Sequence, residues 1–199
     1  MANKEIERKI AVIFATDVVG YSKSIENNET QTLKNLKECR NILDNLILKH
    51  KGRIFNTAGD SVLAEFSSAV TALECATLFQ KKIRDRNSSV TDLENMEFRI
   101  GINIGDVVLD GENLYGEGVN IAARLESFAQ PNGLSISKSL FDLIEGKTEN
   151  KFNYEKDSWD IIEKFISLFK VKLYDIINKD VLNKKEIICE LDQIIILNN

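Results

Sequence analysis

The stretch from Gly52 to Phe66, GRIFNTAGDSVLAEF, decides the fold, because it has the pattern of two short strands joined by a tight turn. The runs 53–57 and 61–66 are rich in β-branched and aromatic residues, and Ala-Gly-Asp separates them. Glycine in a short connection between two such runs is typical of a β-hairpin. We therefore predict a hairpin with Asp60 on its turn.

The segments on either side of this hairpin alternate between strand and helix patterns. Before it, the apolar run 9–16 (KIAVIFAT) predicts a buried strand, and 29–51 predicts a helix with a leucine-rich stripe. The pattern after the hairpin predicts a helix over 67–86, strands over 98–104 and 107–109 around Gly105-Asp106, a helix over 118–129, a strand over 134–137, a short helix over 139–144 and returning strands between 152 and 177. This order indicates the α+β class: a mostly antiparallel sheet flanked by helices, related to ferredoxin-like topologies.

Length and composition limit the class of protein. The 199 residues fit one domain, which we place at 1–179, with 180–199 as a C-terminal tail. A net charge of −5 argues against a nucleic-acid partner, which needs clustered Lys and Arg. The N-terminus does not resemble a signal peptide, and we see no apolar run long enough to span a membrane. The three cysteines are far apart and fit free thiols in a reducing compartment, so we expect a cytoplasmic protein.

Two aspartates are candidates for a metal site. Asp17 follows the first strand, and Asp60 lies on the hairpin turn. In a β-α-β-β arrangement the first strand lies beside the hairpin, so both carboxylates can reach one edge of the sheet. Two bare carboxylates at close range repel each other, and divalent Mg²⁺ or Mn²⁺ ions would remove that conflict. Each aspartate taken alone fits an ordinary turn residue equally well. Their glycine-containing surroundings, 17–22 and 57–61, favour phosphate binding by backbone N–H groups.

A second candidate pair lies on the helix predicted over 118–129. Asn120 and Arg124 are four residues apart and therefore share a helix face. An arginine fixed in this way can stabilise charge that develops on a phosphoryl group. In isolation, a pair with this spacing is more typical of a solvated surface.

Four ordered segments make the sequence resemble the class III nucleotidyl cyclases, the adenylate and guanylate cyclase family. They are FATDVVGYS (14–22), GRIFNTAGDSVLAEF (52–66), FRIGINIGDVV (98–108) and NLYGEGVNIAARLE (113–126). The resemblance runs from about residue 8 to 177. It implies the class III cyclase fold and the conversion of a nucleoside triphosphate to a 3′,5′-cyclic nucleotide and pyrophosphate.

The resemblance also implies roles for individual residues. Asp17, Asp60 and the backbone carbonyl of Val18 match the ligands of two Mg²⁺ or Mn²⁺ ions per site. The remaining matches are Arg124 with the arginine that stabilises the transition state, Asn120 with the residue that orients the ribose, Arg99 with a cation that pairs with the terminal phosphates, and Lys164 or Lys170 with a further phosphate-binding lysine. In this family the site lies between two protomers, so a chain that carries both halves implies a head-to-tail homodimer with two sites.

Two positions that select the base depart from the purine patterns of the family. Adenylate cyclases commonly have Lys and Asp there, and guanylate cyclases Glu and Cys, whereas this sequence has Asn56 and Asn113. An Asn amide both donates and accepts hydrogen bonds, which suits the edge of uracil among other bases. The family includes bacterial pyrimidine cyclases of Pycsar antiphage defence, so we predict UTP as substrate and cyclic UMP as product.

Other readings remain open at this point. Adenylate cyclase activity is the main alternative, since some bacterial adenylate cyclases also vary at the two positions. A catalytically inactive cyclase-like binding module is disfavoured, because all the implied metal, ribose and arginine positions are filled. A diguanylate cyclase is excluded, because its Gly-Gly-Asp/Glu-Glu-Phe turn is replaced here by Ala-Gly-Asp-Ser.

Overall fold

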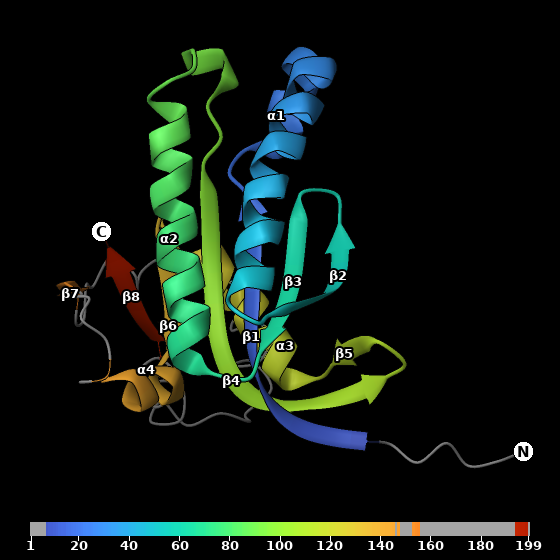
Figure 1. The fold of residues 1–199 in the computed structure, drawn as a ribbon, viewed down its shortest axis with the longest axis vertical. Coiled ribbons are helices and arrows are strands. Elements are labelled where there is room, and N and C mark those ends of the chain that lie inside the picture. The colour runs from blue at the N-terminus through green and yellow to red at the C-terminus, as the bar shows by residue number, and fades with distance from the viewer. Residues whose placement is uncertain (1–6, 146, 148–152, 156–193, 199) are drawn as a thin grey trace, which may run out of the picture.

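The hairpin forms as predicted and lies at one edge of a mixed sheet (Figure 1). The computed structural model describes residues 7–145, 147, 153–155 and 194–198. Strands β2 (Arg53–Ala58) and β3 (Ser61–Phe66) form the hairpin, and β3 pairs antiparallel with β1 (Glu7–Val18). The turn between β2 and β3 has Gly59 at φ +60°, which favours glycine.

The rest of the described sheet has the order β2-β3-β1-β4-β6-β8-β7, with β5 paired to β4. The described pairs are antiparallel except for β4 with β6, which are parallel. The remaining elements are α1 (Tyr21–Lys49), α2 (Ala69–Asn87), a 3₁₀ turn (Asp92–Glu94), β4 (Phe98–Asp110), β5 (Asn113–Tyr115), α3 (Glu117–Phe128), β6 (Leu134–Ser137), α4 (Lys138–Ile144), β7 (Asn153–Glu155) and β8 (Ile194–Asn198). The predicted α+β class is therefore confirmed.

Helices cover both faces of the sheet, and the alternation along β1 shows which residues face each layer (Figure 1). Val12, Phe14 and Val18 belong to the larger core cluster, which includes residues of α1 and α2. Ala11, Ile13 and Ala15 belong to a second cluster, which includes residues of α3. Asp17 continues the second series, so its side chain projects on the α3 side of the sheet.

Strand β4 differs from the prediction, which placed a break at Gly105-Asp106. The strand runs without interruption from Phe98 to Asp110, and Gly105 pairs with Ala11 of β1 in the ladder. A Cβ on Gly105 would lie 3.2 Å from the Cα of Gly118 in α3. The glycine therefore lies where α3 packs against the strand, and it does not mark a turn.

Two further segments differ from the predicted boundaries. Helix α1 begins at Tyr21, eight residues before the predicted start, and non-helical backbone at Asn28 (φ −159°, ψ 88°) interrupts it where the leucine pattern begins. The end of the predicted tail forms β8, which pairs with β6 and β7. Of the returning strands predicted between 152 and 177, the described residues contain β7; the rest of that range and the boundary at 179/180 lie outside the described residues.

The predicted free thiols are confirmed for the two cysteines that the structure describes. Cys39 and Cys75 are buried and form no disulfide. Burial raises the pKa of the Cys39 thiol to about 11 and that of the Cys75 thiol to about 12. No helix in the described part of the chain combines the length and apolar character that a membrane crossing needs.

Candidate active site

The carboxylates of Asp17 and Asp60 lie close together where β1 ends and β3 begins. We call this end of the strands the carboxylate edge. Asp17 lies near the end of β1, and Asp60 lies on the turn that precedes β3, the strand paired with β1. The backbone N–H of Val18 donates a hydrogen bond to Oδ2 of Asp60 at 3.0 Å. This bond holds the Asp60 carboxylate beside the residue that follows Asp17.

Arg99 forms a bidentate ion pair with Asp17. The two residues are direct partners in the β1–β4 register. Nε of Arg99 donates to Oδ1 of Asp17 at 3.1 Å, and Nη2 donates to Oδ2 at 2.6 Å. The predicted phosphate-binding cation therefore contacts a predicted metal ligand directly, and both carboxylate oxygens of Asp17 have an arginine donor.

Glu126 is a third carboxyl group at this edge, and the sequence interpretation missed it. Its Oε1 lies 3.2 Å from Nε of Arg99, and its side chain is 13% exposed. Burial is the largest cause and the neighbouring Asp17 the next, and together they raise the pKa of Glu126 to about 8, although Arg99 opposes the increase. Oε1 has no hydrogen-bond partner in the described part of the chain.

Helix α3 reaches this site because it packs along β4 in a regular register. A Cβ on Gly101 would lie 2.2 Å from the carbonyl oxygen of Ala122, so helix and strand are in backbone contact there. Four residues of a helix rise about 6 Å, close to the roughly 6.7 Å spanned by two residues of a strand. Every second residue of β4 therefore meets every fourth residue of α3. The pairs are Asn103 with Gly118, Gly101 with Ala122, and Arg99 with Glu126.

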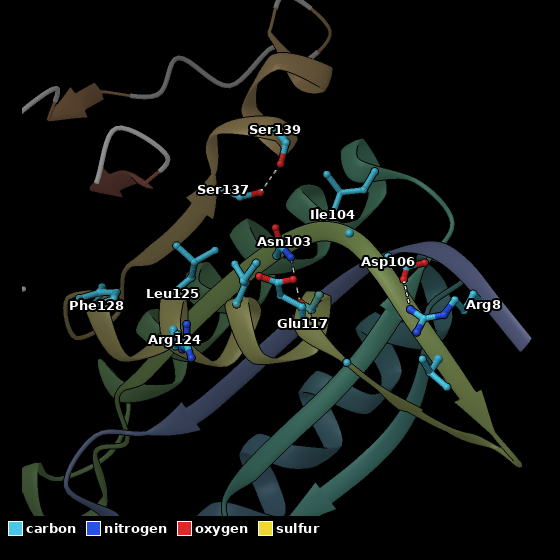
Figure 2. Close-up of a pocket in the computed structure, with 15 residues that line it drawn as sticks. Arg8, Asn103, Ile104, Asp106, Glu117, Arg124, Leu125, Phe128, Ser137 and Ser139 are labelled. Atoms are coloured by element: carbon cyan, nitrogen blue, oxygen red, sulfur yellow. Dashed lines mark hydrogen bonds and ion pairs between the residues drawn. The ribbon is translucent and has the colours of Figure 1, made fainter. Parts of the chain in front are cut away.

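Asn120 and Arg124 lie on a different side of α3. Each is two residues from a position that faces β4, a rotation of about 200° around the helix. Both are exposed. Arg124 and Leu125 line a cavity of about 480 Å³ bounded by β4, α3 and the β6–α4 junction (Figure 2). Neither Asp17 nor Asp60 is among the described residues that line this cavity. The structure therefore brings the acidic pair together and keeps it apart from Asn120 and Arg124 within one chain.

The two predicted base-selecting residues lie near the β2 edge of the sheet. Asn56 on β2 is exposed, and Asn113 at the start of β5 is half-buried. Nη1 of Arg53 in β2 donates to the carbonyl of Glu112 at 2.6 Å, which joins β2 to the turn before β5. The predicted phosphate-binding candidates Lys164 and Lys170 lie outside the described residues.

The donor set at the carboxylate edge fits a divalent cation. Asp17 and Asp60 supply hard oxygen ligands, which Mg²⁺ and Mn²⁺ prefer. The guanidinium of Arg99 already occupies a cation position against Asp17. No group of three or more His, Cys, Asp or Glu residues in the described segments is arranged to hold a metal ion. Further ligands would therefore come from backbone, water or phosphate oxygens, as is usual for Mg²⁺.

The fold places two carboxylates and an arginine together at the end of β1 in an α+β domain. Residues 2–164 match the family model described as the adenylate and guanylate cyclase catalytic domain. This chain therefore belongs to the adenylate and guanylate cyclase family and is of the nucleotidyl cyclase class.

Curated relatives and solved structures agree with this assignment. A Rhizobium meliloti protein named "Putative adenylate cyclase 3" is 39% identical over 154 residues, and an adenylate cyclase of Streptomyces coelicolor is 31% identical over 132 residues. The alignments cover 76% and 66% of this chain but 26% and 33% of those relatives, so the chain spans about a third of their length or less.

Among solved structures, an adenylate/guanylate cyclase/hydrolase from Silicibacter pomeroyi has a TM-score of 0.70 at 35% identity, covering 76% of this chain and 89% of that one. The adenylyl cyclase CyaB from P. aeruginosa has a TM-score of 0.69 at 20% identity, covering 98% of this chain and 96% of that one. The second similarity supports the fold alone.

Proposed function

We propose that this chain converts a nucleoside triphosphate to a 3′,5′-cyclic nucleotide and pyrophosphate in a site shared by two copies of the chain. The observation that carries this proposal is the separation of the two half-sites. The carboxylates of Asp17 and Asp60 lie at the sheet edge, whereas Asn120 and Arg124 project from another side of α3. A substrate that needs both sets of groups would meet them only across a head-to-tail interface, which generates two equivalent sites in a closed dimer.

The reaction would be an in-line attack of the ribose 3′-oxygen on the α-phosphorus. Asp17, Asp60 and the carbonyl of Val18 would hold two Mg²⁺ or Mn²⁺ ions, which lower the pKa of the 3′-hydroxyl and neutralise the pyrophosphate. Asn120 of the second copy would orient the ribose, and its Arg124 would stabilise the charge on the α-phosphoryl group. Arg99 would bind the terminal phosphates, for which it must first leave Asp17.

The test of this function is incubation of the purified protein with each of the four nucleoside triphosphates and Mn²⁺, with products identified by mass. A 3′,5′-cyclic nucleotide should form, and Asp60→Ala should abolish it. Asp44→Ala is the matched control, because Asp44 pairs with Arg40 within α1, which packs in the core cluster on the face of the sheet opposite α3. The absence of a cyclic product with every nucleotide would contradict the proposal.

We further propose that UTP is the preferred substrate and that its product serves as a second messenger in antiphage defence. Asn56 and Asn113 supply amide groups that both donate and accept, instead of the charged pair typical of adenylate cyclases. An unmatched buried donor or acceptor costs about 1–3 kcal/mol, so two such positions can discriminate between bases.

ATP is the second candidate, and the names of the two curated relatives favour it. Rates of cyclic UMP and cyclic AMP formation in the same assay separate the candidates. The double variant Asn56→Lys with Asn113→Asp, which installs the adenylate pattern, should shift the ratio towards cyclic AMP. Wild-type protein that makes cyclic AMP much faster than cyclic UMP or cyclic CMP would overturn the pyrimidine preference and leave the cyclase assignment standing.

A further inference from the structure

Asp17 is already paired with a cationic side chain in this structure, so Arg99 and a metal ion would compete for its charge. Both of its carboxylate oxygens accept hydrogen bonds from Arg99. A divalent cation at Asp17 would repel the guanidinium and compete with it for the carboxylate charge, which weakens these bonds. A half-buried guanidinium that loses its carboxylate partner is destabilised unless another acceptor replaces it.

Glu126 is placed to be that second acceptor. Its Oε1 lies 3.2 Å from Nε of Arg99, the same nitrogen that donates to Asp17, and it has no hydrogen-bond partner among the described residues. A small rotation of the guanidinium would turn the 3.2 Å approach into a hydrogen bond.

The packing of α3 on β4 fixes the position of this carboxyl group. A Cβ on Gly101 would lie 2.2 Å from the backbone nitrogen of Glu126 and 2.8 Å from its Cα. Arg99 and Gly101 are two residues apart on β4 and so share a face of the strand. The glycine therefore brings the backbone of Glu126 against β4 and its carboxyl group next to the guanidinium.

We propose that Glu126 is a positioning residue for Arg99: it receives the guanidinium when a divalent cation takes Asp17, and it holds Arg99 ready for the terminal phosphates. This inference rests on the proposed function, since it assumes a cation at Asp17 and Asp60. Glu126 acts through Arg99 and does not touch the metal.

The experiment is a double-mutant cycle read by Mn²⁺ binding without nucleotide, with free Mn²⁺ followed by electron paramagnetic resonance. The four proteins are wild type, Glu126→Gln, Arg99→Gln and the double variant, each checked by thermal unfolding. Glutamine keeps the size of the glutamate side chain, so Glu126→Gln should leave the fold intact. Directly interacting residues are commonly coupled strongly enough that Glu126→Gln should weaken Mn²⁺ binding about tenfold when Arg99 is present. In the Arg99→Gln background the same change should have less than about a twofold effect.

Each outcome of this cycle decides between two roles. A loss that depends on Arg99 supports the positioning role. A loss of equal size in both backgrounds would show that Glu126 acts on the metal directly and would overturn the proposal, as would the absence of any loss. If wild type binds no Mn²⁺, the metal site of the proposed function fails together with this inference. If Mn²⁺ binds and the two changes are additive, only the role of Glu126 fails.

Discussion

Replacing Gly101 with alanine should separate α3 from β4. The added Cβ would lie 2.2 Å from the carbonyl oxygen of Ala122 and 2.2 Å from the backbone nitrogen of Glu126. Both contacts are with backbone atoms of a helix, so no side-chain rotation relieves them. Ordinary contact with a Cβ begins near 3.4 Å. The helix or the strand must therefore move by about 1 Å, and overpacking of this kind commonly costs 1–3 kcal/mol.

We expect Gly101→Ala to lower the free energy of unfolding by about 3 kcal/mol, at the upper end of that range because backbone atoms clash on both sides of the helix turn. Activity should fall by more than the loss of folded protein explains. Helix α3 carries Asn120, Arg124 and Glu126, and a displacement of about 1 Å in a positioning element can cost roughly 100-fold in rate. Urea unfolding measures the first effect, and the rate of cyclic nucleotide formation per folded protein measures the second.

Gly105→Ala is the matched control on the same strand. Its Cβ would lie 3.2 Å from the side-chain amide of Asn103 and from the Cα of Gly118, so a shift of a few tenths of an ångström accommodates it. We expect a change in unfolding free energy below about 1 kcal/mol for this variant. If Gly101→Ala were no less stable than Gly105→Ala, the close contact of α3 with β4 described here would be wrong.

Three further predictions concern the site and the sheet. Asp17→Ala should abolish cyclisation while the protein stays folded, since the change removes a proposed metal ligand and empties no apolar core; near-normal turnover measured alongside circular dichroism would contradict the metal role. Arg124→Ala should also be inactive alone. A mixture of Asp17→Ala and Arg124→Ala proteins should regain activity, because each heterodimer keeps one site with both halves intact. A mixture that stays inactive after demonstrated subunit exchange would show that the site is not shared. Burial acts to raise the pKa of Glu65, but hydrogen bonds from Lys9 and Arg53 outweigh it and lower that pKa below 4.5. A lowered pKa in the folded state stabilises the protein above the unfolded pKa, and this stabilisation is lost as pH falls through the folded value. Glu65→Gln should therefore be less stable than wild type at pH 7 and equally stable in acid, as measured by urea unfolding across pH. A stability difference that does not change with pH would contradict this prediction.

Local pattern was enough to locate the acidic half of the site. The apolar run before Asp17 and the glycine-containing turn at Asp60 are contiguous signals, and each predicts its element without knowledge of the rest of the chain. The β-α-β-β order then predicts that the first strand lies beside the hairpin, and the β1–β3 register confirms it. The metal role of Asp17 and Asp60 stays a prediction, and so do the roles of the ribose and base residues Asn120, Asn56 and Asn113.

The same local signals failed where tertiary contact decides the meaning of a residue. Gly105-Asp106 has the composition of a turn, yet β4 continues through it because both residues pair with β1 in the ladder. The prediction also missed the first turns of α1, from Tyr21 to the irregular residue Asn28. These turns lack the apolar stripe on which the prediction relied.

The sequence by itself determined the elements, their order and the acidic pair, because hydrophobic periodicity and turn chemistry act over a few neighbouring residues. Only the tertiary structure decided the position of Glu126 beside Arg99, since Glu126 follows Arg124 by two residues and has the pattern of a helix surface position. Its one indication in the sequence is the series of small residues four and eight positions earlier, Ala122 and Gly118, which lets the helix lie against β4. Arg99 and Glu126 are brought within 3.2 Å because α3 packs on β4 at Gly101, and such a contact depends on the shapes of two elements that are distant in the sequence.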